Sequence, residues 1–101
     1  MNKRFTDYQD ELISALQDPR EAIGYLNAAL QDEDPRIFLV ALKNVLDAQD
    51  KDLAEFARET QLNRENLYRM LSSHGNPKLT SIVSVLNGLG LHLAIQEGKR
   101  K

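Results

Sequence analysis

The 101-residue sequence contains no cysteine, only three prolines and five glycines, and few aromatic residues. Without cysteine, disulfide bonds and cysteine-based zinc sites are excluded. No apolar run approaches the roughly 18 residues that a membrane-spanning helix needs. The N-terminus also lacks the apolar segment of a secretory signal. We therefore expect one small domain with a single modest core, located in the cytoplasm.

The residues that catalysis or metal binding would need are not grouped in the sequence. No serine lies in a nucleophile elbow. His74 and His92 are far apart and lack the paired spacing of metal ligands. Asp47, Asp50 and Asp52 lack the glycine and the final glutamate of a calcium loop. We expect neither enzymatic activity, nor a cofactor, nor a metal ion.

Charge is unevenly distributed along the chain, although the net charge is only −2. Residues 1–57 hold six Lys/Arg and twelve Asp/Glu, a net charge of −6. Residues 58–101 hold seven Lys/Arg and three Asp/Glu, a net charge of +4. An acidic segment is repelled by DNA phosphates, whereas a basic one is attracted. The second half is therefore the candidate for nucleic-acid binding, although charge segregation is also common in small domains.

Each proline follows an aspartate or asparagine, in the pairs Asp18-Pro19, Asp34-Pro35 and Asn76-Pro77. Asp or Asn is a favoured N-cap, and proline suits the first helical position, so each pair predicts a helix start. Apolar spacing supports an all-α bundle of five to six helices. The helices are expected over 7–17, from Pro19, from Pro35 to near Ala48, from Asp52, from Asn63, and from Pro77 to Gly88 or Gly90. In the first helix, the apolar face is Tyr8, Leu12, Ile13 and Leu16.

The predicted elements divide a single domain over 1–101 into three parts. Residues 1–48 form an acidic helical part. Residues 50–90 contain two short helices, a tight turn and a third helix, which is the spacing of a helix-turn-helix. Residues 91–97 form a short C-terminal strand.

In a helix-turn-helix, the second helix enters the major groove and its N-terminal residues face the bases. Here that helix is expected near 64–72, with Leu67, Met70 and Leu71 facing inward. The outward residues are then Arg64, Glu65, Tyr68 and Arg69, with Asn66 at the edge. Arg can bind guanine, Asn adenine and Glu cytosine, so these residues are candidates for base reading. The alternative is an ordinary solvated helix face. Candidates for phosphate contacts are Lys51, Ser72, Ser73, His74, Asn76 and Lys78.

Leu91, Leu93 and Ile95 alternate with less apolar residues, which is the period of a strand. No second strand is evident in the sequence, and an unpaired strand leaves its backbone groups without partners. We therefore expect these three residues to form a dimer strand that pairs with a second copy. The alternative is an extended tail that covers the core.

Residues 25–95 resemble the addiction-module antidote family, which comprises HigA-like antitoxins with a phage-repressor-type helix-turn-helix. The stretches LNRENLYRMLSSHGNPKLTSIVSVLNGLGLHLAI (62–95) and YLNAALQDEDPRIFLVALKNVL (25–46) carry the resemblance. It implies an antitoxin that binds its operator as a dimer and neutralises a small RelE/HigB-like toxin. By analogy, base reading falls on Arg64, Glu65 and Arg69, with Asn63, Asn66 and Tyr68 beside them.

The sequence thus predicts a DNA-binding antitoxin of a type II toxin–antitoxin module that represses its own operon. Its expected partners are double-stranded DNA with a palindromic operator, a basic cognate toxin and a second copy of itself. Two alternatives stay open. One is a plain transcriptional repressor without a toxin partner. The other is a helical protein-interaction module that has lost DNA binding.

Overall fold

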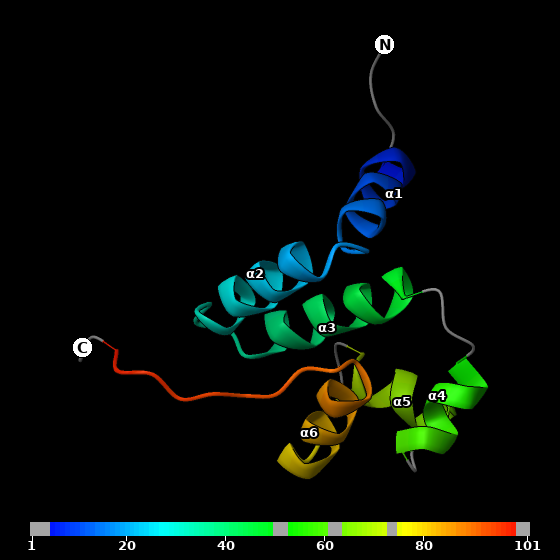
Figure 1. Ribbon diagram of the computed structural model, residues 1–101, viewed down its shortest axis with the longest axis vertical. Coiled ribbons are helices and arrows are strands. Elements are labelled where there is room, and N and C mark those ends of the chain that lie inside the picture. Colours follow the sequence, from blue (N-terminus) through cyan, green and yellow to red (C-terminus); the bar gives the residue numbers. More distant parts are fainter. Residues whose placement is uncertain (1–4, 50–52, 61–63, 73–74, 99–101) are drawn as a thin grey trace.

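The computed structural model describes residues 5–49, 53–60, 64–72 and 75–98. Within these ranges the chain forms six helices and no strand (Figure 1), which confirms the all-α class. None of the described helices is long and apolar enough to cross a bilayer. The helices are α1 (Phe5–Ala15), α2 (Pro19–Leu30), α3 (Arg36–Ala48), α4 (Leu53–Thr60), α5 (Arg64–Met70) and α6 (Leu79–Gly88).

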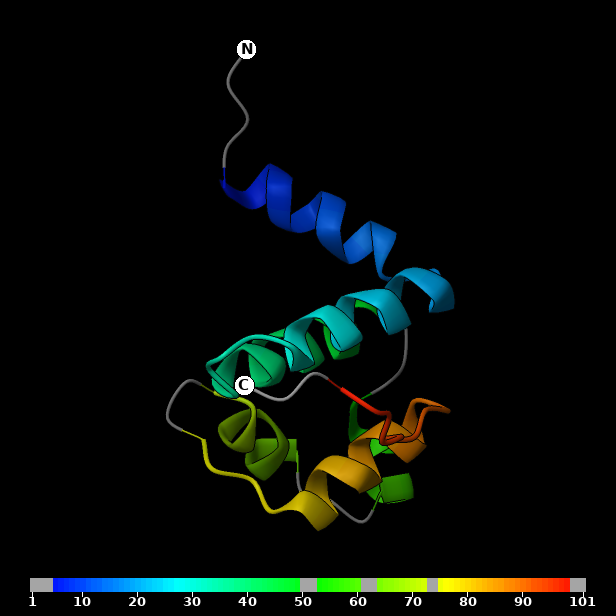
Figure 2. The same cartoon turned by 90° about the vertical axis from the view of Figure 1, so that its left-hand side faces the viewer.

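The helices form two groups that share one core (Figures 1 and 2). In the first group α3 packs against α1 and α2, and in the second α4 packs against α5 and α6. Helix α3 has the most buried side chains, and they join those of α4, α5 and α6 in one cluster. The largest side chains in that cluster that are almost fully buried are Leu16, Leu42, Val45, Phe56, Leu67, Leu71 and Val85.

Two of the three predicted helix starts occur at, or one residue beyond, their prolines. The Asp18 carboxylate accepts a hydrogen bond from the Arg20 N–H at 3.0 Å, and Pro19 is the first residue of α2. The Asp34 carboxylate likewise accepts from the Arg36 N–H at 3.0 Å, although α3 begins at Arg36 rather than Pro35. Both acidic residues therefore satisfy an otherwise unpaired N–H group, as an N-cap does.

The third predicted start is wrong by two residues. Helix α6 begins at Leu79, with Lys78 at the N-cap position and no side chain capping it. Residues 75–78 are irregular, and Lys78 has an extended backbone with ψ 151°. Pro77 thus extends the connection from α5, because the residue before a proline is itself disfavoured in the helical region. Asp52 and Asn63, the other predicted caps, lie outside the described residues.

Gly90 rather than Gly88 terminates α6. Its φ of 78° lies in the left-handed region that favours glycine. The Gly90 N–H donates to the Asn87 carbonyl at 3.0 Å, and the Leu91 N–H donates to the Leu86 carbonyl at 2.8 Å. This pair of bonds is a Schellman motif, which satisfies the last carbonyls of a helix. The motif also fixes the direction in which the C-terminal segment leaves α6.

Two sequence-based expectations differ from the structure. Tyr8 is exposed, although it shares a helical face with the buried Leu16. Residues 91–98 have no regular secondary structure, so the expected strand over 91–97 is not formed in the single chain. The physical reason is that the described part of the chain offers no strand with which this segment could pair. Figure 1 shows the segment leaving α6 and extending away from the helices toward the C-terminus.

Candidate nucleic-acid interface

Helices α4 and α5 contact each other, and buried side chains hold both to the rest of the molecule. Phe56 on α4 and Leu67 on α5 are almost fully buried, as is Leu71 just after α5. Met70 is half-buried against the same core. The inward side of α5 is therefore the one that the sequence predicted.

The opposite side of α5 faces outward. Glu65, Asn66 and Arg69 are exposed, and Tyr68 is half-buried. Arg64 begins α5, but its side chain and all of Asn63 lie outside what the structure describes. Glu65 and Asn66 also interact with other groups of the chain. Arg69 is thus the exposed cation of α5 whose position is clearest.

The end of α5 is fixed by short-range hydrogen bonds. The Ser72 hydroxyl donates to the Arg69 carbonyl at 2.7 Å, and the Gly75 N–H donates to the Ser72 carbonyl at 2.9 Å. Gly75 also lies close to the carbonyl group of Met70, where a Cβ atom would collide with backbone. The Ser72 proton is therefore engaged within the chain, and its predicted phosphate contact stays a prediction.

Of the remaining predicted phosphate contacts, Asn76 and Lys78 are exposed in the connection between α5 and α6. Lys51, Ser73 and His74 lie outside the described residues. The structure adds Arg58, which is exposed in the last turn of α4 and was not among the predicted contacts. Its basic character and its place in the first helix of the pair were the available signals.

The charge of this region is more balanced than the sequence totals suggest. Over the described residues from 53 to 98, four basic residues accompany four acidic ones. Much of the positive charge of the second half lies at residues 99–101, outside the described range. No group of three His, Cys, Asp or Glu among the described residues is placed to hold a metal ion. The chemistry available here is hydrogen bonding and charge attraction.

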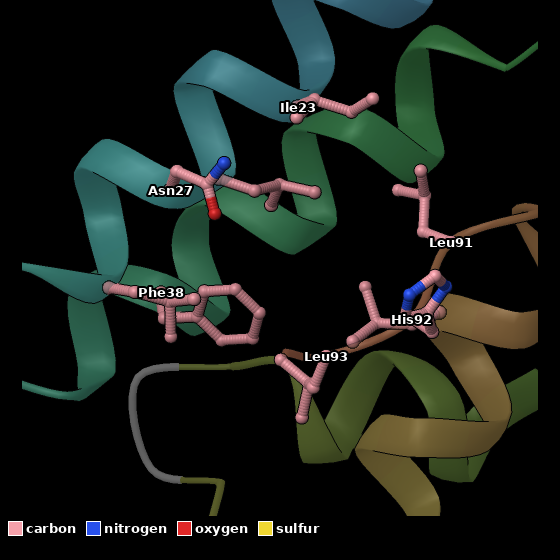
Figure 3. A pocket seen from close by; sticks show the side chains of 9 residues that line it. Ile23, Asn27, Phe38, Leu91, His92 and Leu93 are labelled. Atoms are coloured by element: carbon pink, nitrogen blue, oxygen red, sulfur yellow. The ribbon is translucent and has the colours of Figure 1, made fainter. Parts of the chain in front are cut away.

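Two further hollows lie outside the α4–α5 region. One is a cavity of about 60 Å³ between α2 and the C-terminal segment. Figure 3 shows Ile23 and Asn27 of α2 above it and Leu91, His92 and Leu93 of the C-terminal segment on the other side. The second is an open groove of about 270 Å³ between α2 and α3. Its lining residues are Tyr25, Ala28, Ala29, Asp32, Ile37, Val40 and Ala41.

Comparison with known proteins gives two matches of nearly full length. A family model described as "Probable addiction module antidote protein" matches residues 7–97. A protein of Haemophilus influenzae, printed as "Uncharacterized protein", is 28% identical over 99 residues, which cover 98% of each chain. No solved structure matches the chain.

Proposed function

This chain belongs to the family of probable addiction module antidote proteins, and on this premise we propose that it is a DNA-binding antitoxin of a type II toxin–antitoxin module. In this proposal α4, α5 and α6 form a phage-repressor-type helix-turn-helix, as in HigA-like antitoxins. The protein binds a palindromic operator and represses its own operon. It also neutralises a RelE/HigB-like toxin.

The observation that carries the DNA-binding proposal is the two-sided character of α5. Leu67 and Leu71 anchor the helix in the core, while Glu65, Asn66 and Arg69 are exposed beside one another. A recognition helix needs this arrangement, because its inner side fixes the angle at which its outer side meets the bases. Arg64, Tyr68 and Asn63 complete the proposed base-reading set. The exposed Arg58, Asn76 and Lys78 are placed to contact phosphates.

The toxin-binding part of the proposal rests on the first three helices. Residues 7–49 contain nine Asp/Glu and three Lys/Arg. The groove between α2 and α3 adds apolar surface, with Ile37 42% and Val40 47% exposed. Asp32 lines this groove, and Glu33 follows it in the exposed turn. An apolar groove with an acidic border is complementary to a basic protein, and we propose that the toxin docks here.

The proposed mechanism of repression requires two copies of the protein. A palindromic operator has two half-sites, and a two-fold dimer presents one recognition helix to each. We propose that Leu91, Leu93 and Ile95 form the strand through which the copies associate. The segment is extended in the single chain and exposes apolar side chains, which fits this role.

The decisive experiment is a gel shift with the DNA upstream of the gene, comparing Arg69→Ala with Arg20→Ala. Both variants lose one exposed arginine, but Arg20 lies on α2, away from the proposed interface. Arg69→Ala is expected to weaken specific binding by about 1–3 kcal/mol, whereas Arg20→Ala should bind normally. Equal binding by both variants would remove α5 from the interface. Co-purification with the product of the neighbouring gene tests the toxin, and its failure would leave a plain repressor.

A further inference from the structure

We propose that two copies pair their C-terminal segments antiparallel about a two-fold axis through Leu93, so that Ile95 of each copy lies beside Leu91 and the α2 groove of the other. This inference rests on the homodimer of the proposed function. It specifies the register and the receiving surface, and it does not depend on which residues read DNA.

The first observation is the unpaired backbone of the C-terminal segment. The Leu91 N–H closes the Schellman motif, but no backbone hydrogen bond joins residues 92–98 to the other described residues. An extended segment with free N–H and C=O groups is a template for pairing with another strand. The described chain contains no strand to occupy it, so the pairing partner must come from another molecule.

The second observation is an apolar surface shared by the segment and α2. Ile95 is fully exposed and Leu93 is 40% exposed. Across from them, Ile23 and Leu30 of α2 are 44% and 49% exposed. A groove of about 740 Å³ separates α2 from the segment, and Leu91 lines both this groove and the smaller cavity seen in Figure 3. Clustered exposed apolar side chains of this kind mark an interaction surface.

The occupant that fits this surface is a second copy of the same chain. The groove is lined by Ile23, Asn27, Leu30, Gln31, Gly90, Leu91, His92, Ala94 and Gln96, none of which is an Asp, Glu, Lys or Arg. Two identical surfaces meet without like-charge repulsion only if they are uncharged or self-complementary. The groove between α2 and α3 differs, because its acidic border would repel its own copy and suits a basic partner.

The order of apolar residues selects the register. In an antiparallel pair, directly opposite side chains lie on the same face, so an apolar residue should face an apolar one. An axis through Leu93 pairs Leu93 with itself and Leu91 with Ile95. Moving the axis to Ala94 would place Leu91 opposite Glu97. Moving it to His92 would place Ile95 opposite Leu89, which caps α6 and is not in the segment.

This register also explains why Ile95 is exposed in the single chain. Leu91 is half-buried beside Ile23 and Leu30 of its own α2. A partner's Ile95 that pairs with Leu91 is brought to the same groove. Each copy thus covers the other's exposed isoleucine, and the contact closes on itself as a two-fold interface does.

Cysteine cross-linking tests the register, since the natural chain has no cysteine to interfere. Directly opposite residues in an antiparallel pair have Cα atoms about 4.5–5.5 Å apart, within the span of a disulfide. Leu93→Cys alone should form a covalent dimer under mild oxidation. Leu91→Cys and Ile95→Cys, on chains of different length, should cross-link efficiently only when mixed. Ile37→Cys, an exposed isoleucine on α3, is the control and should not cross-link.

Sedimentation of Ile95→Asp against Ile37→Asp tests the surface without a disulfide. Each copy of Ile95→Asp would lose one isoleucine from the interface, which should raise the dimer dissociation constant at least about 100-fold. Ile37→Asp makes the same substitution on another exposed isoleucine and should stay dimeric.

Three results would overturn the inference. They are a monomeric natural protein, a dimer that is not cross-linked at these pairs, and a loss of toxin binding rather than dimerisation in Ile95→Asp. The gel shift separates this failure from that of the proposed function. Absent cross-links with Arg69-dependent DNA binding would reject the register alone, and cross-links without DNA binding would reject the DNA-binding role alone.

Discussion

At the scale of single residues, Gly88 lies where α6 meets α4. A Cβ atom at this position would be 2.7 Å from Thr60 Cγ2 and 2.8 Å from Phe56 Cε2. Gly88→Ala should therefore lower the free energy of unfolding by about 1–3 kcal/mol, because the two helices must move apart. Gly24→Ala is the control, since no atom lies within 4 Å of its added methyl group. It should raise stability by about 0.4–1 kcal/mol, and urea denaturation of both variants measures the contrast.

Asp34 contributes a pH-dependent term at the same scale. The side-chain hydrogen bond from Arg36 and the Arg36 N–H hold the pKa of the Asp34 carboxyl below its ordinary value of 3.8. A lowered folded-state pKa stabilises the protein above the unfolded pKa, and this contribution is lost as the pH falls through the folded-state pKa. We expect Asp34→Asn to lose less stability than the natural protein between about pH 5 and pH 2. Thermal unfolding across this range tests it, and parallel curves would contradict it.

At the scale of the elements, Asn44 of α3 joins α1 to α2. Its Oδ1 accepts a hydrogen bond from Gln9 Nε2 at 3.1 Å, and its Nδ2 donates to the Tyr25 hydroxyl at 2.9 Å. Asn44→Ala removes both bonds from a partly buried site and should cost about 1–3 kcal/mol. Hydrogen exchange should then accelerate most in α1. Asn27→Ala, at an exposed asparagine of α2, should change little.

The groove between α2 and α3 supplies a second test at this scale. Val40→Lys places a positive charge in the apolar groove that we propose for the basic toxin. It should weaken toxin binding at least about tenfold, because an exposed apolar anchor is replaced by a repelling charge. Val83→Lys makes the same change at an exposed valine of α6 and should bind normally. Titration calorimetry with the toxin measures both, and equal affinities would move the toxin to another surface.

At the scale of the whole molecule, DNA binding should depend strongly on salt. If a dimer neutralises about six phosphates, the logarithm of the binding constant should fall with the logarithm of salt concentration with a slope of roughly −5. Fluorescence anisotropy between about 50 and 200 mM salt measures this slope. A slope near zero would show that phosphates contribute little, which would contradict binding through exposed cations such as Arg58 and Lys78.

The association of two copies links this scale to the elements. Gly90 sets the direction of the C-terminal segment, and Leu93 and Ile95 are left exposed along it. The acidic first three helices and the polar side of α5 belong to different helix groups (Figure 2). In our proposal the three surfaces therefore serve separate partners, namely a second copy, the toxin and DNA.

The sequence by itself determined the features that depend on neighbours along the chain. Asp18 and Asp34 marked the starts of α2 and α3, because an N-cap bonds to an N–H only two residues away. Apolar spacing placed Leu67 and Leu71 inside, because helical periodicity is a local property. The all-α class follows from the same local signals.

Only the tertiary structure decided the features that depend on distant segments. Pro77 was expected to open a helix, but the connection from α5 runs on to Leu79. Tyr8 has the right spacing for the core, yet it is exposed. The closeness of Leu91 to Ile23 and Leu30 likewise has no signal along the chain, because these residues lie far apart in sequence. Burial and close contact depend on how whole helices pack, and no local pattern specifies that packing.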